Sequence, residues 1–311
     1  MRWVFRGRHF LSLSDYTADE ILYILQTAEG LKRRWMVGET LTILSGKTLA
    51  MVFEKPSLRT RMSFEMAMYQ LGGRAMYIGP QEIGLGKREA IKDVATVLAR
   101  MVDGVMVRTF AHEILVEMAC HSRVPIINGL SDLHHPCQVL GDLLTIQEKK
   151  GRLPELKITY LGDGNNVCHS WLAAAAILGL QLTICSPVKY LPHPDIWQWA
   201  QERGAQSGAT IVHEVDPFVA ARASDVLYTD VWTSMGKENE MEERINHFKT
   251  FQVNDSLLRQ AKDDVIVLHC MPAHRGQEIT DEVMDGPHSA VIDEAENRLH
   301  AQKALLALIL N

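Results

Sequence analysis

The sequence lacks long hydrophobic runs, paired-cysteine motifs and any excess of positive charge. Its longest apolar stretch, AAAAILGL at residues 173–180, is too short to cross a bilayer, and Arg and His interrupt the apolar residues near the start, so neither a membrane span nor a signal peptide is expected. The five cysteines stand without CxxC spacing, which favours free thiols in a reducing cytoplasm over a disulfide framework. The formal net charge of -6 argues against a nucleic-acid binder. We therefore expect a cytoplasmic protein without membrane or nucleic-acid partners.

The 311 residues contain a regular alternation of short apolar runs and helix-periodic segments. This alternation is typical of an α/β fold in which crossover helices join parallel strands. The length suggests two domains of roughly 150 residues each, and the pattern restarts after KKGRLPEL at 149–156, so we predict domains at 1–150 and 151–293, each a mostly parallel sheet flanked by helices. The strands are expected at 49–53, 74–78, 104–108, 124–128, 157–161, 181–185, 209–213, 225–229 and 264–270.

The last segment, residues 294–311, has the pattern of a helix that is too apolar to stand free in water. We expect it to pack back on the first domain. The side chains expected to be buried by that helix are Leu299, Ala304, Leu305, Leu308 and Ile309. Two further sets are expected in the core, namely Ile91, Val94, Leu98 and Met101, and Met66, Met68 and Tyr69.

A basic bend, EKPSLRTR at 54–61, follows the first expected strand and leads into a helix that should end at Gly72 and Gly73. Ser57 is a preferred N-cap, and the free amides and dipole at a helix start favour an anion. Arg59 and Arg61 add forked donors that suit phosphate, although pairing with Glu54, Glu65 or a neighbouring helix would also explain them.

Other expected strands also end in polar residues, and ligands of open α/β sheets bind at that edge. These residues are Arg108, His134, His135, His269 and Cys270. Together with the basic bend they predict a phosphate-binding site at the carboxyl edge of the sheet.

Four motifs resemble those of the carbamoyltransferase family. SLRTR resembles its phosphate-binding motif, HPCQ at 135–138 its His-Pro-x-Gln motif, and DVWTSMG at 230–236 with HCMP at 269–272 resembles the ornithine-specific members. The resemblance extends to GDGNN at 162–166 and AENR at 295–298. It implies carbamoyl transfer from carbamoyl phosphate to the side-chain amine of L-ornithine, giving L-citrulline and phosphate by direct attack through a tetrahedral intermediate, with no cofactor and no metal. Arginine synthesis is favoured over arginine breakdown as the cellular direction.

The resemblance also implies roles for individual residues. Arg108 would bridge the phosphate and the carbonyl oxygen, to which His135 and Thr60 would donate, and Arg298 would lie at the carbamoyl group. The carbamoyl phosphate set is Ser57, Leu58, Arg59, Thr60, Arg108, His135, Gln138, Met271 and Arg298. The ornithine set is Asn166, Asp230, Ser234, Met235 and Cys270. The first four would hold the α-amino and α-carboxylate end, and Asp230 and Cys270 would lie near the amine that attacks. Leu58 stands where the motif commonly has Thr, so only its backbone amide could contribute.

The family further implies a homotrimer or a multiple of trimers, in which the loop GPQEIGLGKRE at 79–89 completes a neighbour's site, with Gln81 as the contributing residue. The charged segment 236–248 is expected to form a lid that orders when ornithine binds.

Four alternatives follow from the residues themselves. Gly162 and Gly164 after a strand suggest a dinucleotide site, but Val167 replaces the third glycine of the fingerprint and no acidic residue ends the next strand. A non-catalytic binding protein with the same fold remains open.

The run His134-His135-x-Cys137 has poor metal-ligand spacing, and His134 is expected at the surface. His269 is not expected to act as a base for Cys270, because neighbouring strand residues point to opposite faces. Cys120, Cys168 and Cys185 are expected to be packing residues.

Overall fold

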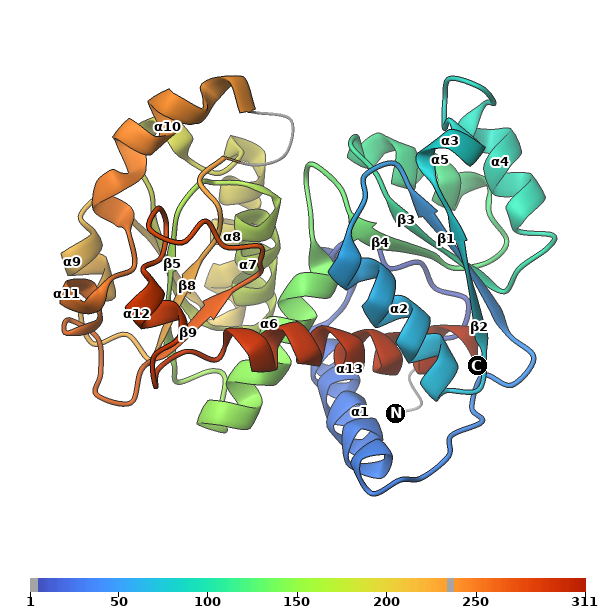
Figure 1. Ribbon diagram of the computed structural model, residues 1–311, viewed down its shortest axis with the longest axis horizontal. Coiled ribbons are helices and arrows are strands. Elements are labelled where there is room, and N and C mark those ends of the chain that lie inside the picture. Colours follow the sequence, from blue (N-terminus) through green and yellow to red (C-terminus); the bar gives the residue numbers. More distant parts are fainter. Residues whose placement is uncertain (1–4, 234–237) are drawn as a thin grey trace. The chain divides into compact units, whose positions relative to one another are not determined.

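The computed structural model describes residues 5–233 and 238–311, which form two compact units (Figure 1). Unit 1 contains the chain up to Leu144 together with Glu296–Asn311, and unit 2 is Thr145–Ala295. Each unit is a wholly parallel sheet flanked by helices, so the predicted α/β fold is confirmed. In the described part of the chain, no helix is both long and apolar enough to cross a membrane.

The sheet of unit 1 has the strand order β2-β1-β3-β4. Its strands are β1 (Thr48–Phe53), β2 (Arg74–Ile78), β3 (Gly104–Arg108) and β4 (Ile126–Leu130). Its helical segments are η1 (Leu13–Asp15), α1 (Ala18–Met36), α2 (Leu58–Gln70), α3 (Pro80–Ile83), α4 (Ile91–Leu98), α5 (His112–His121) and the greater parts of α6 (Pro136–Lys150) and α13 (Val291–Leu310).

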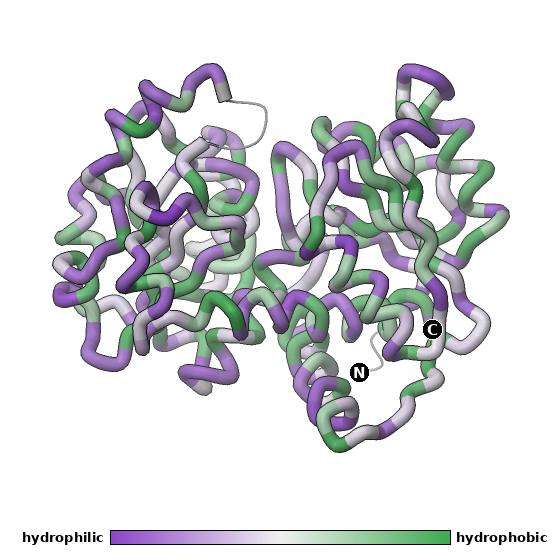
Figure 2. The backbone as a smooth tube through the Cα atoms, viewed as in Figure 1, coloured by the Kyte–Doolittle hydropathy of each residue, from purple (hydrophilic) through white to green (hydrophobic). Residues whose placement is uncertain are grey.

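The sheet of unit 2 has the strand order β7-β6-β5-β8-β9. Its strands are β5 (Lys157–Leu161), β6 (Gln181–Cys185), β7 (Thr210–Glu214), β8 (Val226–Thr229) and β9 (Ile266–His269). Its helical segments are α7 (Asn166–Leu178), η2 (Val188–Tyr190), α8 (Pro194–Ser207), α9 (Pro217–Ala221), η3 (Glu238–Glu240), α10 (Met241–Phe248), η4 (Lys249–Phe251), α11 (Asp255–Leu258) and α12 (Asp281–Met284). Hydrophilic residues predominate along α10, at the upper left of Figure 2.

The bend between β1 and α2 is built as the sequence predicts. Ser57 is the N-cap of α2, and its Oγ accepts a hydrogen bond from the amide of Thr60 at 3.2 Å. After α2 ends, Gly72 adopts a φ of +80°, which a side chain would strain, and this glycine turns the chain into β2. The first turn of α2 therefore lies directly after the carboxyl end of β1.

Two of the predicted core residues and one of the predicted packing cysteines are wrong. Cys120 is exposed near the end of α5, whereas Cys168 and Cys185 are buried as predicted. Tyr69 is 67% exposed, because the buried face of α2 runs through Phe64, Ala67 and Met68 and Tyr69 falls beside it. Met101 is 74% exposed, because α4 ends at Leu98 and the helical period stops there.

The C-terminal helix packs on unit 1, as predicted, but it buries polar residues as well as leucines. Lys303 is fully buried, and its Nζ donates to Oε1 of Gln70 in α2 at 2.9 Å and to the carbonyl of Leu31 in α1 at 3.4 Å. Gly141 of α6 lets the helix approach closely, since a Cβ there would lie 3.1 Å from the amide nitrogen of Arg298. These contacts fix the position of Arg298 relative to α2 and α6.

Burial, with the charge of Lys32 as a smaller cause, lowers the pKa of Lys303 to about 8. Between pH 8 and the ordinary lysine value of 10.5, the unfolded chain thus binds a proton that the folded chain does not, so the contribution of Lys303 to stability rises with pH. We expect the wild-type free energy of unfolding, measured relative to Lys303→Met, to rise by up to about 3 kcal/mol over this interval. Urea denaturation at pH 7.5 and 10 measures the difference. Lys92→Met, which alters an exposed lysine, is the control, and parallel curves for wild type and Lys303→Met would contradict the prediction.

Candidate functional site

The buried hydroxyl of Thr60 is the centre of a cationic cluster in unit 1. Nη2 of Arg298 donates to Oγ1 of Thr60 at 2.9 Å, and Nη1 of Arg108 donates to the same atom at 3.4 Å. The Ser57 hydroxyl also donates to it at 3.1 Å. Two guanidinium groups, from the end of β3 and from α13, therefore converge on the first turn of α2, where the helix dipole already favours an anion.

The two arginines of the basic bend differ in their surroundings. Arg61 pairs with Glu65 at 3.3 Å and lies 4.4 Å from the centre of the Tyr77 ring, so for Arg61 the ion-pair interpretation is correct. The Nε of Arg59 is buried and has no hydrogen-bond acceptor among the residues that the structure describes. A buried donor in this state is the kind of group that a bound anion satisfies. Leu58 projects its side chain into solvent and is 74% exposed, which leaves its backbone as the part that faces the bend.

His135 is buried at the start of α6. Burial, followed by the positive charges of Arg298 and Arg108, holds the pKa of His135 well below its usual value, so the ring is neutral at pH 7 and can donate one N–H. Gln138, one turn into the helix, donates its Nε2 to Oδ1 of Asp142 at 2.8 Å. The arrangement supplies neutral and cationic donors to the same end of the sheet of unit 1.

The prediction that His134 lies at the surface is wrong. His134 is 9% exposed, because its amide donates to Oγ of Ser131 at 3.1 Å and its ring packs edge-on to His112. Cys137 points away into the core, where its thiol donates to the carbonyl of Asn128 at 3.3 Å and burial raises its pKa to about 12. A thiol so unlikely to ionise is a poor metal ligand.

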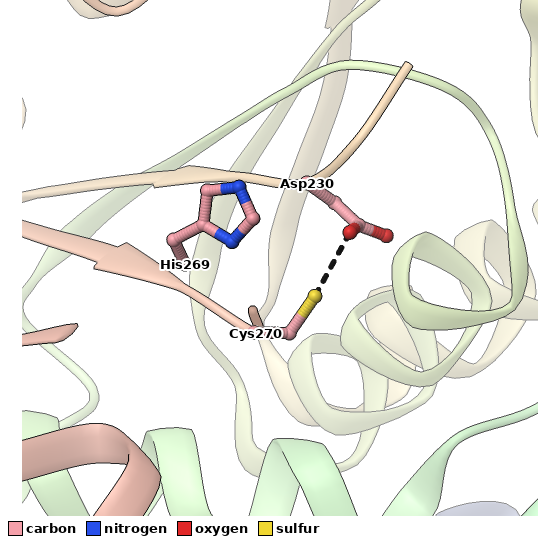
Figure 3. Close-up of side chains that lie close together, drawn as sticks. All are labelled: Asp230, His269 and Cys270. Carbon is pink, nitrogen blue, oxygen red and sulfur yellow. Dashed lines mark hydrogen bonds between the residues drawn. The ribbon is translucent and has the colours of Figure 1, made fainter. Parts of the chain in front are cut away.

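The carboxylate of Asp230 organises the carboxyl edge of the sheet in unit 2. Its Oδ1 accepts from the thiol of Cys270 at 2.9 Å, drawn as a dashed line in Figure 3, and from the amide of Val231 at 2.7 Å. Its Oδ2 accepts from Nδ2 of Asn165 at 2.7 Å. Asp230 and Cys270, which follow β8 and β9, are thus brought together as the sequence predicts.

Asn165, which holds the carboxylate of Asp230, was not predicted as a site residue, whereas its neighbour Asn166 was. The Asn165 side chain caps α7 by accepting from the amides of Val167 and Cys168 at 2.9 and 3.1 Å. Asn166 is the first residue of the helix and is half-buried. The signal was available, because an asparagine directly before a helical run is a preferred N-cap.

The same cap argues against the dinucleotide alternative. In such sites the first amides of the helix receive the pyrophosphate, whereas here Asn165 occupies two of them. Close packing within the chain also explains why residue 164 is glycine, because a Cβ there would lie 2.2 Å from the backbone nitrogen of Pro192.

His269 is close to Asp230 and Cys270 but is hydrogen-bonded to neither (Figure 3). One candidate ligand atom from each of the three residues lies within 4.8 Å of the others. Both ring nitrogens are already engaged, Nδ1 by the amide of Met271 at 2.8 Å and Nε2 with Glu278 at 2.9 Å. The expectation that His269 does not serve as a base for Cys270 agrees with this geometry.

Other predicted residues are placed as follows. Ser234 and Met235 lie outside the described residues. Helix α10, which belongs to the expected lid, is anchored by buried Arg244, whose Nη1 donates to Asp163 at 2.8 Å and to the carbonyl of Trp232 at 3.0 Å. Gln81 is exposed on α3.

Comparison with known proteins identifies the family. Residues 8–148 match the aspartate/ornithine carbamoyltransferase carbamoyl-P binding domain, and residues 154–309 match the Asp/Orn binding domain. Ornithine carbamoyltransferases from Pyrococcus horikoshii and Archaeoglobus fulgidus are 51% and 52% identical to this chain, over 98% and 97% of it and 96% and 97% of their own lengths. The solved structure of ornithine carbamoyltransferase from Pyrococcus furiosus has a TM-score of 0.97 and 49% identity, and covers 99% of both chains. The chain belongs to the aspartate/ornithine carbamoyltransferase family.

Proposed function

We propose that the protein transfers the carbamoyl group of carbamoyl phosphate to the side-chain amine of L-ornithine, with L-citrulline and phosphate as products. The observation that carries the proposal is the convergence of Arg108 and Arg298 on Thr60 at the N-terminus of α2, a site built for a phosphorylated anion. The relatives that match nearly the whole chain bear the name ornithine carbamoyltransferase. The relative from Pyrococcus furiosus bears the name anabolic, which supports a place in arginine synthesis.

Carbamoyl phosphate binds to unit 1 in this proposal. Ser57, Arg59, Thr60 and the amide of Leu58 hold the phosphate. Arg108 bridges the phosphate and the carbonyl oxygen, and neutral His135 donates to that oxygen as it gains negative charge. Arg298 lies at the carbamoyl group, and Gln138 orients the carbamoyl nitrogen, with the carbonyls of Cys270 and Met271 as the further acceptors for it.

Ornithine binds to unit 2, where Asn166, Asp230, Ser234 and Met235 hold the α-amino and α-carboxylate end. Its side-chain ammonium, with an ordinary pKa near ~10, lies at Asp230 and Cys270 and must lose a proton before it attacks. The amine lone pair forms the new C–N bond at the carbonyl carbon, and collapse of the tetrahedral intermediate breaks the C–O bond and releases phosphate.

We extend the proposal to the organisation of the chain. Residues 1–150 bind carbamoyl phosphate, 151–293 bind ornithine, and 294–311 return to the first domain. The protein works in the cytoplasm as a homotrimer or a multiple of trimers, with Gln81 entering a neighbour's site. Leu58, Met62 and Tyr69 of α2 and Met76 of β2 are exposed apolar side chains, at 74%, 49%, 67% and 55%, of the kind that an assembly buries.

The test is product formation from carbamoyl phosphate with ornithine, N-acetylornithine, putrescine and aspartate in parallel. We expect citrulline from ornithine and no turnover of the other amines. Arg59→Ala should lower kcat/KM for carbamoyl phosphate about 100-fold, since a charge-assisted contact is worth roughly 2–3 kcal/mol. Arg61→Ala, which removes a paired arginine two residues away, is the matched control and should change it less than about threefold.

Turnover of another amine would overturn the acceptor but not the transfer. Anion binding without turnover of any amine would support the non-catalytic binding protein. An equal effect of the two arginine variants would contradict the assignment of the phosphate site.

A further inference from the structure

Met271, one of the residues predicted to contact carbamoyl phosphate, has an unusual backbone conformation. Its φ is +51°, in the left-handed region that favours glycine, and among the described residues Ala223 is the other non-glycine residue with positive φ. Met271 directly follows Cys270, whose thiol contacts Asp230. A side chain persists in this region only where its surroundings hold it, and such positions concentrate at functional sites.

The imidazole of His269 supplies that support. The amide of Met271 donates to Nδ1 of His269 at 2.8 Å, which places the ring proton on Nε2, and Nε2 lies 2.9 Å from Oε1 of Glu278. Both side chains are fully buried. The backbone amide of His269 is held as well, by Oε2 of Glu294 at 2.7 Å. The imidazole therefore connects the left-handed residue to a buried carboxylate.

Glu278 is in turn fixed to the body of unit 2. Its Oε1 also accepts from the amide of His274 at 2.6 Å, which closes the loop between β9 and α12. Its carbonyl accepts from the amide of buried Val253 at 2.8 Å. Contacts thus run from the core through Glu278 and His269 to the Cys270–Met271 turn.

We propose that His269 and Glu278 are positioning residues, whose buried pair holds the Cys270–Met271 turn and thereby sets the turnover number without touching either substrate. This rests on the proposed function, in which the Cys270 thiol and the carbonyls of Cys270 and Met271 face the reacting groups. A displacement of about 1 Å in such groups typically costs about 100-fold in rate. The alternative is that the pair stabilises the fold and nothing more.

Two substitutions of Glu278 separate these roles. In Glu278→Gln the amide oxygen can replace Oε1 and accept from both His269 and His274. The NH₂ group then takes the place of Oε2, which is buried and has no hydrogen-bond partner among the described residues. Glu278→Leu removes the acceptor. Glu278→Gln buries an NH₂ group without an acceptor, and Glu278→Leu leaves the donors of His269 and His274 without one, so both variants should lower the melting temperature. Only Glu278→Leu should release the Cys270–Met271 turn.

We expect Glu278→Gln to keep kcat within about fivefold of wild type and Glu278→Leu to lose about 10- to 100-fold in kcat, with KM for carbamoyl phosphate unchanged in both. Both are measured below their melting temperatures. Glu282→Leu, which alters an exposed glutamate on α12, is the control and should match wild type. A Glu278→Leu enzyme with wild-type kcat, or equal losses in the two Glu278 variants, would overturn the proposal.

A second measurement needs no catalytic activity. Alkylation of Cys270 by iodoacetamide, followed by mass spectrometry against the exposed Cys120 as internal reference, reports the turn directly. We expect the rate ratio of Cys270 to Cys120 to change at least threefold in Glu278→Leu and to stay at the wild-type value in Glu278→Gln. If wild type lacked carbamoyl transfer, the proposed function would fail while this ratio still tested the turn. If Glu278→Leu does not fold, loss of kcat or an altered ratio in folded Glu278→Gln overturns the proposal, and wild-type values for both support it.

Discussion

Replacement of Arg108 by methionine is expected to lower kcat/KM for carbamoyl phosphate about a thousandfold, or roughly 4 kcal/mol of transition-state stabilisation. The guanidinium leaves β3 next to the carboxyl end of β1, because Arg108 pairs in register with Phe53 and its carbonyl accepts the amide of Glu54 at 2.8 Å. It is buried and donates to Thr60. In the proposed reaction this buried cation meets both the phosphate and the developing oxyanion, so it should act more strongly in the transition state than in the ground state. Steady-state kinetics at saturating ornithine measures the loss.

Arg108→Lys and Arg100→Met make the experiment specific. The lysine keeps the charge but loses the planar fork, so an intermediate loss is expected. Arg100 is exposed beyond the end of α4, and its replacement should leave kcat/KM unchanged. A loss smaller than tenfold in Arg108→Met would remove Arg108 from the catalytic residues, provided that its far-ultraviolet circular dichroism matches wild type.

The strands could be predicted because their ends carry local signals. The runs 74–78, 104–108, 157–161 and 181–185 coincide with β2, β3, β5 and β6, since glycines, turn residues and changes of hydrophobic period mark their bounds. The errors at Tyr69 and Met101 arose where the position of a helical face depended on where the helix begins and ends. The ends of a helix depend on caps and tertiary contacts, which the hydrophobic periodicity of the sequence does not report.

The site divides in a similar way between local and distant contacts. The Ser57 cap followed from the preference for serine before a helix. The proximity of Asp230 and Cys270 followed from the resemblance to the carbamoyltransferase family. The bend itself did not separate Arg59 from Arg61, because the partner of each depends on which way the helix turns. The buried pair of Arg244 and Asp163 joins residues far apart in the chain, and no spacing rule predicts it.

Asp230→Asn is expected to lower kcat/KM for ornithine about a thousandfold while the affinity for carbamoyl phosphate stays the same. The substitution removes the negative charge proposed to receive the ornithine ammonium, and loss of one partner of a buried charged contact costs about 2–5 kcal/mol. It also creates a local conflict. If the oxygen of the new asparagine keeps the place of Oδ1, its NH₂ group faces Nδ2 of Asn165. The amide of Asn165 cannot flip to avoid this, because its oxygen caps α7. Two donors then face each other, which should lower stability by about 1–3 kcal/mol.

The double variant Asp230→Asn with Asn165→Asp separates the charge from the hydrogen bond. Aspartate at position 165 still caps the helix and accepts from the new amide, so the stability lost in Asp230→Asn should largely return. The carboxylate now lies at position 165, on the other side of the 2.7 Å hydrogen bond that joins Asn165 to Asp230, so kcat/KM for ornithine should remain at least 100-fold below wild type. Thermal unfolding and initial rates on the same preparations measure both quantities. Recovery of activity together with stability would mean that the hydrogen-bond geometry, and not the charge at position 230, prepares ornithine for attack.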